Sequence, residues 1–173
     1  WLLECLRPET PFVVLELSGE QGSAKSSTQN ALRDLIDPNK SNLRTAPKQK
    51  DDVVISARNS HMVSFENLSH LSADYQDALC SLATGAGYAT RTLYSNLDET
   101  TMELKKPIML NGISIVVTAQ DLLDRTLHID LPMLESVSTE ADLAAYWETN
   151  YAAAFTGLLD AFSSALAYID RVD

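Results

Sequence analysis

The chain has 173 residues, of which 45% are hydrophobic and 21% charged, the composition of one globular domain with a core of its own. No apolar run reaches the roughly 20 residues of a membrane-spanning helix, so no membrane association is expected. The net charge of −11 excludes a broad basic surface for nucleic acid, and Cys5 and Cys80 favour a reduced pair in a cytoplasmic protein.

The first half of the chain alternates between strand and helix patterns. Residues 12–17 are a short apolar, β-branched run that predicts a buried strand, and a glycine-rich loop follows directly. A helix is expected over 25–36, where Pro38 ends it. The elements expected next are a short strand within 43–46, a helix over 51–58, a buried strand over 62–65 and a helix over 72–83.

The second half begins as a hairpin and ends as helix. The predicted elements are hairpin arms at 88–94 and 101–104, a buried strand over 108–110, a helical turn over 119–124 and a strand over 126–131. From residue 133 an aromatic and aliphatic stripe recurs every three or four residues, which predicts core-facing helix divided at Gly157. We therefore expect an α/β core over 1–132 and a helical segment over 133–173.

The glycine-rich loop carries the most specific motif in the chain. Gly19 to Ser26 follow the phosphate-loop pattern G-x-x-x-x-G-K-[S/T], with Ala24 in place of the second glycine. Lys25 is expected to contact the β- and γ-phosphates of ATP, and the Ser26 hydroxyl to bind Mg²⁺. The predicted nucleotide-binding residues are Gly19, Glu20, Gln21, Gly22, Ser23, Ala24, Lys25, Ser26 and Ser27.

Polar residues at the ends of later strands supply candidates for the chemistry. Glu66 follows a buried strand and is the candidate general base or metal-shell carboxylate, with Asn67 positioning it. Asn111 ends the strand that begins after Pro107, where an amide could orient the attacking water, although Asn-Gly is also a common turn pair. Arg125 is either an arginine finger for a neighbouring subunit or an exposed arginine paired with a nearby aspartate.

Together these motifs resemble the AAA+ ATPases of the superfamily 3 helicase kind, notably the primase–helicase proteins of phages, large DNA viruses and mobile elements. The resemblance covers about residues 10–170 and includes bacterial ATP-binding proteins of integrated elements. It implies a P-loop NTPase fold: a three-layer α/β/α core, a parallel sheet in the order 5-1-4-3-2 and a partial, truncated C-terminal helical lid. It also implies ATP hydrolysis with Mg²⁺ between the subunits of a homo-oligomeric, hexameric ring that acts on single- or double-stranded DNA.

The same resemblance assigns roles to single residues. Lys25 and Ser26 match Walker A, Glu66 and Asn67 match Walker B, Asn111 matches sensor 1, and Arg125 matches the arginine finger. The positively charged residues beside the hairpin that would contact DNA are Arg91, Lys105 and Lys106.

Two other functions compete with a DNA motor. The hairpin loop at 96–99 is acidic, as is the chain, which favours a regulatory or assembly switch in which ATP controls association and nothing is unwound. A small phosphotransferase also begins with strand, phosphate loop and helix. The positions of Asn111 and Arg125 suit a ring ATPase better than a phosphotransferase.

Overall fold

The computed structural model describes residues 1–45, 50–85, 87–91, 99–136 and 138–169. Its main sheet has five parallel strands, β1 (Val14–Ser18), β2 (Arg44–Thr45), β3 (Val63–Leu68), β6 (Ile108–Gly112) and β7 (Thr126–Asp130). They lie in the order β2-β3-β6-β1-β7. This order is the predicted 5-1-4-3-2 read from the opposite edge, so the predicted fold class is confirmed.

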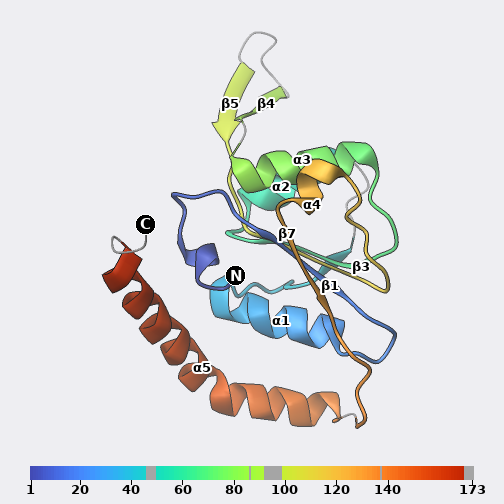
Figure 1. Ribbon diagram of the computed structural model, residues 1–173, viewed down its shortest axis with the longest axis vertical. Helices are drawn as coiled ribbons and strands as arrows, with labels where there is room; N and C mark the ends of the chain where they lie inside the picture. The colour runs from blue at the N-terminus through green and yellow to red at the C-terminus, as the bar shows by residue number, and fades with distance from the viewer. Residues whose placement is uncertain (46–49, 86, 92–98, 137, 170–173) are drawn as a thin grey trace.

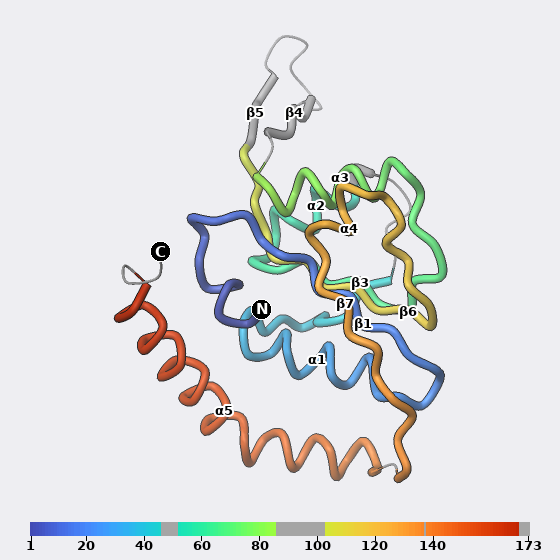
Figure 2. Tube along the Cα trace, in the orientation of Figure 1, coloured from blue at the N-terminus to red at the C-terminus, as the bar shows by residue number. Residues whose placement is uncertain are grey.

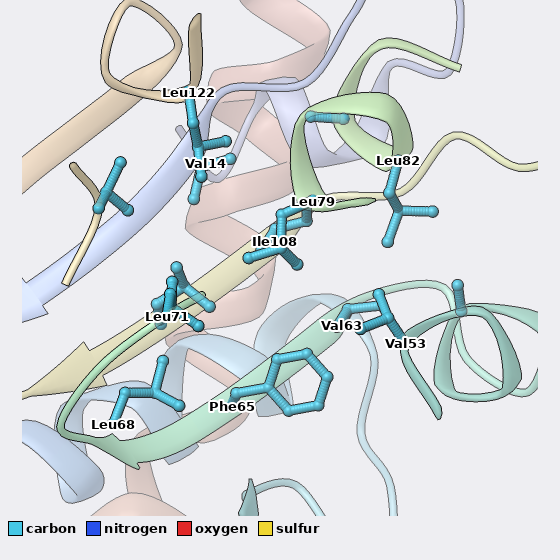
Figure 3. Packing of buried hydrophobic residues seen from close by; sticks show 14 of the residues in the cluster. Val14, Val53, Val63, Phe65, Leu68, Leu71, Leu79, Leu82, Ile108 and Leu122 are labelled. Carbon is cyan, nitrogen blue, oxygen red and sulfur yellow. The ribbon is translucent and has the colours of Figure 1, made fainter. Parts of the chain in front are cut away.

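Helices cover both faces of this sheet (Figure 1). On one face lies α1 (Lys25–Ile36), and on the other lie α2 (Lys50–Arg58), α3 (Ala73–Thr84) and α4 (Gln120–Leu123). Successive side chains of a strand point to opposite faces. Val14 therefore packs in the cluster beneath α2 and α3 (Figure 3), whereas Leu15 and Leu17 pack with Leu32 of α1 on the other side.

The C-terminal end of α1 is fixed to β3 by a buried arginine. Arg33 Nη2 pairs with Asp37 Oδ2 at 3.2 Å, and Arg33 Nη1 donates to the carbonyl oxygen of Asn42 at 3.1 Å. Asp37 Oδ2 also accepts from the N–H of Met62 at 2.9 Å, just before β3. Burial lowers the pKa of Arg33, and the charge of Asp37 opposes that change.

The predicted hairpin is present as a separate two-stranded sheet. Strands β4 (Gly87–Arg91) and β5 (Glu99–Glu103) pair antiparallel, from Gly87 opposite Glu103 to Arg91 opposite Glu99. This sheet extends beyond α3 in Figure 1. Of the acidic loop at 96–99, residues 96–98 lie outside the described residues, and Glu99 begins β5.

The C-terminal helix α5 (Glu140–Tyr168) is one continuous helix, so the predicted division at Gly157 is wrong. It begins at Thr139, whose hydroxyl accepts from the N–H of Asp142, and its first part runs alongside α1 (Figure 2). Trp147 Nε1 donates to Asp34 Oδ2 at 3.0 Å. No residue of α5 is buried, and the aromatic stripe predicted to face a core is at most half-buried. Among the described residues, no helix combines the length and apolarity needed to cross a membrane.

The remaining short helix, η1 (Glu4–Leu6), places Cys5 in the cluster on the α1 side of the sheet. Burial of its thiol raises the pKa of Cys5 to about 12. The thiol therefore stays protonated and inert, as expected for a reduced cysteine in a core.

Candidate functional site

The loop between β1 and α1 has a backbone that requires glycine. Gly19 is buried with φ of 148°, and a Cβ placed on it would lie 2.6 Å from the carbonyl oxygen of Leu131 and 2.6 Å from Ser23 Oγ. Gly22 has φ of 91°. Side-chain-bearing residues rarely adopt such backbone angles. The two glycines therefore allow the chain to turn sharply from strand to helix.

Ala24 occupies the position of the second motif glycine and keeps a glycine-like backbone. Its φ of 58° and ψ of 26° lie in the left-handed region. This conformation costs a non-glycine residue about 1–2 kcal/mol. The loop thus retains its shape despite the substitution, at the expense of local strain.

Lys25 closes the loop on itself. Its Nζ donates to the carbonyl oxygens of Gly19 and Glu20, each at 2.7 Å, and to Ser23 Oγ at 3.3 Å. The ammonium group therefore lies among the loop's own oxygens. To contact a phosphate, Lys25 has to exchange these carbonyl partners for phosphate oxygens.

The chemistry of the loop fits an anion. Ala24, the N-cap of α1, offers no side-chain cap, so the N–H groups of the first turn and the positive end of the helix dipole are left for another acceptor. Ser26 and Ser27 are exposed on that turn. Lys25 adds a full positive charge beside it.

A magnesium ion fits only if phosphate completes its shell. Among the described residues, no group of three or more acidic, histidine or cysteine side chains could hold a metal. Mg²⁺ characteristically takes one or two protein oxygens and obtains the rest from phosphate and water. Ser26 and Glu66 would be those protein ligands.

Glu66 and Asn111 lie at the carboxyl ends of two neighbouring strands, β3 and β6. The phosphate loop follows the carboxyl end of β1, so all three lie at the same end of the sheet. Alternation places Glu66 on the same face of β3 as Ser64, which contacts α1. Glu66 is half-buried, whereas Asn111 is only 2% exposed. Asn111 Oδ1 accepts from the N–H of Asn67 at 2.7 Å. The side chain of Asn67 is exposed, so its contact with this group is made by its backbone.

A further residue of this edge, Gln29, was missed by sequence reasoning. It is fully buried on α1, and its Oε1 accepts from Asn111 Nδ2, while its Nε2 donates to Ser64 Oγ at 2.7 Å and to the carbonyl oxygen of Phe65 at 3.1 Å. The available signal was its spacing. Gln29 follows Lys25 by four residues, which places both on one face of the helix.

A second polar group missed from the sequence joins β1 to β7. Glu16 is 1% exposed, its Oε1 accepts from the N–H groups of Val116 and Val117 at 2.6 and 3.2 Å, and its Oε2 lies 3.4 Å from His128 Nδ1. His128 Nε2 lies 3.1 Å from Ser18 Oγ. Ser18 directly precedes Gly19. The group therefore ties the loop after β6, and the edge strand β7, to the start of the phosphate loop.

Arg125 lies at the amino ends of the strands, whereas the phosphate loop lies at their carboxyl ends. Thr126, which follows it, pairs with Val14 at the start of β1, whereas the loop follows Ser18 at the end of that strand. Four residues of β1 separate these two ends by about 13 Å. Arg125 is exposed and its Nη1 donates to the backbone oxygen of Asp121 at 2.6 Å. Its guanidinium group therefore contacts α4 and not the phosphate loop.

Two of the three residues predicted to contact DNA lie at the same ends of the strands as Arg125. Lys105 and Lys106 precede β6 and are half-buried; the N–H of Lys106 donates to the carbonyl oxygen of Leu82 at 3.1 Å. The backbone of Arg91 ends β4, and its side chain lies outside the described part of the structure.

A pocket of about 320 Å³ lies between the first turns of α1 and the start of α5. It adjoins the phosphate loop through Ser26 and Ser27, and its walls are mainly apolar. The remaining lining residues are Asn30, Ala31, Leu43, Glu140, Leu143, Ala144 and Trp147.

A parallel sheet in this order, with helices on both faces and a glycine-rich loop between β1 and α1, has the fold of a P-loop NTPase core. More narrowly, the chain belongs to the actinomycete integrative conjugative element replication protein family, whose model matches residues 1–169. No curated protein matches the chain.

Solved structures of JCV helicase are similar to this chain. One, bound to an acetamide ligand, aligns with a TM-score of 0.53 and 16% identity, over 78% of this chain and 40% of that chain. Another aligns with a TM-score of 0.49 and 16% identity, over 89% of this chain and 44% of that chain. The chain thus spans less than half the length of JCV helicase. At this identity the similarity establishes the fold.

Proposed function

We propose that the chain is the ATP-binding and ATP-hydrolysing module of a replication protein, and that it acts on DNA as a ring oligomer. One observation carries the proposal. The phosphate loop, Glu66 and Asn111 follow or end separate strands, and all lie at the carboxyl end of the sheet. An anion site, a carboxylate and a buried amide side by side are what hydrolysis of a phosphoanhydride needs.

The residues divide the work by their chemistry. Lys25 and the first turn of α1 would bind the phosphates, and Ser26 with Glu66 would hold Mg²⁺, which screens the phosphate charge when bound. Glu66 would accept the proton of the attacking water. Asn111 would hold the end of β3 in place and sense the phosphate beside it.

Assembly into a ring is supported by the opposite side of the molecule. Arg125 lies about 13 Å along β1 from its own loop, a position that suits a residue serving a neighbour's nucleotide better than its own. The edge strand β7 also exposes Leu127 and Ile129, 43% and 39% accessible, which an isolated chain would leave to water.

The first test is binding. Replacing Lys25 with alanine removes the charge at the centre of the loop, so we expect Mg·ATP to raise the melting temperature of the wild type and to leave that of Lys25→Ala unchanged. Lys40→Ala, at an exposed position after α1, is the control and should respond like the wild type. An equal ATP response in Lys25→Ala would refute the loop assignment.

The second test separates chemistry from binding. Glu66→Gln preserves shape and removes the base, so nucleotide affinity should persist while the hydrolysis rate falls by about 10²-fold or more. Phosphate release and fluorescent-nucleotide binding measure the two properties. Unchanged turnover would remove Glu66 from the reaction.

An ATP-controlled assembly switch is the second candidate, favoured by the net charge of −11. Stimulation of hydrolysis by single-stranded DNA would support the motor. An ATP-dependent change of mass in solution, with hydrolysis indifferent to DNA, would support the switch.

A further inference from the structure

The end of β3 is irregular at the residue that the proposed chemistry depends on. Phe65 pairs with Leu110 and Leu68 with Gly112, so β3 advances by one residue more than β6 between the two pairs. Asn67 has φ of 53°, a left-handed conformation. Such a bulge interrupts the ladder of backbone hydrogen bonds and redirects a side chain. Here Glu66 and Asn67 are the two residues within the bulge, and together they lie opposite Asn111.

Two buried side-chain amides replace the interrupted ladder. The N–H of Asn67 donates to Asn111 Oδ1, Asn111 Nδ2 donates to Gln29 Oε1, and Gln29 Nε2 donates to the carbonyl oxygen of Phe65. This chain of hydrogen bonds begins on the peptide group after Glu66 and ends on the one before it. It therefore brackets Glu66 from both sides.

Each amide can adopt only one orientation within this bracket. A backbone N–H only donates and a carbonyl only accepts, so Asn67 and Phe65 fix the polarity of the chain at its two ends. The second N–H of the Gln29 amide is used by Ser64 Oγ at 2.7 Å. Gln29 is 0% and Asn111 2% exposed, so reversing either amide would leave buried polar groups unpaired.

We propose that Gln29 is a positioning residue that sets the direction of the Glu66 carboxylate. The proposal rests on the role proposed above for Glu66 in hydrolysis. Gln29 belongs to α1, the helix that begins at Lys25, so the helix that binds phosphate also holds the end of β3. A shift of the helix is thereby passed to the carboxylate through hydrogen bonds of fixed direction.

The test compares Gln29→Leu with a matched control, Gln76→Leu. Gln76 on α3 is 4% exposed, and its amide also makes buried bonds to backbone, to Leu71, Thr118 and Ala119, on the face of the sheet opposite α1. We expect Gln29→Leu to lower kcat about 10- to 100-fold while the Kd for fluorescent ATP stays within about twofold. Gln76→Leu should leave kcat within about twofold of wild type. Unchanged kcat in Gln29→Leu, or equal losses in both variants, would overturn the proposal.

A conservative variant gives a second readout through pH. In Gln29→Glu the protonated carboxyl can still donate to Phe65 and accept from Asn111, whereas the ionised form opposes the Phe65 carbonyl oxygen with negative charge. Burial favours the neutral form. The ratio of variant to wild-type kcat should therefore rise as the pH falls from about 8.5 to about 6. A ratio independent of pH would contradict the donor role of Gln29.

Hydrogen exchange tests the bracket without nucleotide. Asn67 is exposed, so protection of its amide depends on the bond to Asn111, and Gln29→Leu should speed its exchange about tenfold or more relative to Gln76→Leu. A wild type that fails to bind Mg·ATP would refute the proposed function alone. Unchanged exchange at Asn67 would refute the bracket, whatever the protein does with ATP.

Discussion

Ala24 is the residue at which the phosphate loop departs from its motif, and its backbone shows the consequence. Ala24 carries a side chain at a φ of 58°, an angle that favours glycine. It is also the N-cap of α1, so the higher helix propensity of alanine does not stabilise it there. Ala24→Gly should relieve the strain and raise the free energy of unfolding by about 0.5–1 kcal/mol. Urea denaturation measures this difference.

The control for this prediction lies on the same helix. Ala31 has ordinary helical geometry within α1, so Ala31→Gly should lower the free energy of unfolding by about 1 kcal/mol. The same substitution is thus expected to have opposite signs at the two positions. Destabilisation by both would show that Ala24 is not strained.

At the scale of elements, α5 shows that a single glycine does not end a helix. A Cβ built on Gly157 meets nothing within 4 Å, and the helix continues through it. Gly157→Ala should raise the free energy of unfolding by about 0.5–1 kcal/mol, because alanine loses less entropy than glycine on entering a helix. Denaturant unfolding followed by circular dichroism measures the gain.

Gly85 provides the opposite case at the end of α3. Its φ is 90°, and a Cβ there would lie 3.2 Å from the side chain of Lys105. Gly85→Ala should therefore lower the melting temperature, in contrast to Gly157→Ala. If both alanine variants moved the melting temperature in the same direction, helix-end geometry would not be what distinguishes them.

At the scale of the whole molecule, Arg125 and Lys25 lie at opposite ends of the strands of one sheet. If Arg125 serves a neighbour's nucleotide, Arg125→Ala and Lys25→Ala should each abolish hydrolysis alone, and mixing them should restore part of it. Mixed subunits would pair an intact loop with an intact arginine. Steady-state ATPase measurements over a range of mixing ratios would show the recovery.

Arg58→Ala is the control for that experiment, since Arg58 is exposed at the end of α2. It should hydrolyse ATP like the wild type and give no complementation pattern. Additive, uncomplemented loss on mixing the Arg125 and Lys25 variants would place Arg125 outside the reaction.

Local pattern alone predicted most of the architecture. The strand before Gly19, the helix after Lys25 and the strand before Glu66 are set by neighbours in the chain, through alternation, helical spacing and backbone angles. These signals depend on a few adjacent residues, so they can be recognised in the sequence before the fold is known. The division at Gly157 was wrong because helical hydrogen bonds along α5 outweigh the modest cost of one glycine.

Tertiary structure decided which polar residues act together. Gln29 and Asn111 are 82 positions apart in sequence, and Glu16 meets the N–H of Val116 across 100 positions. Burial requires each such group to find a partner, but it does not say which one until the strands are ordered. The sequence by itself determined a phosphate loop in an α/β fold. The order of the sheet decided that Glu66 would be bracketed by amides from α1 and β6, and that Arg125 would lie at the opposite ends of the strands from the phosphate loop.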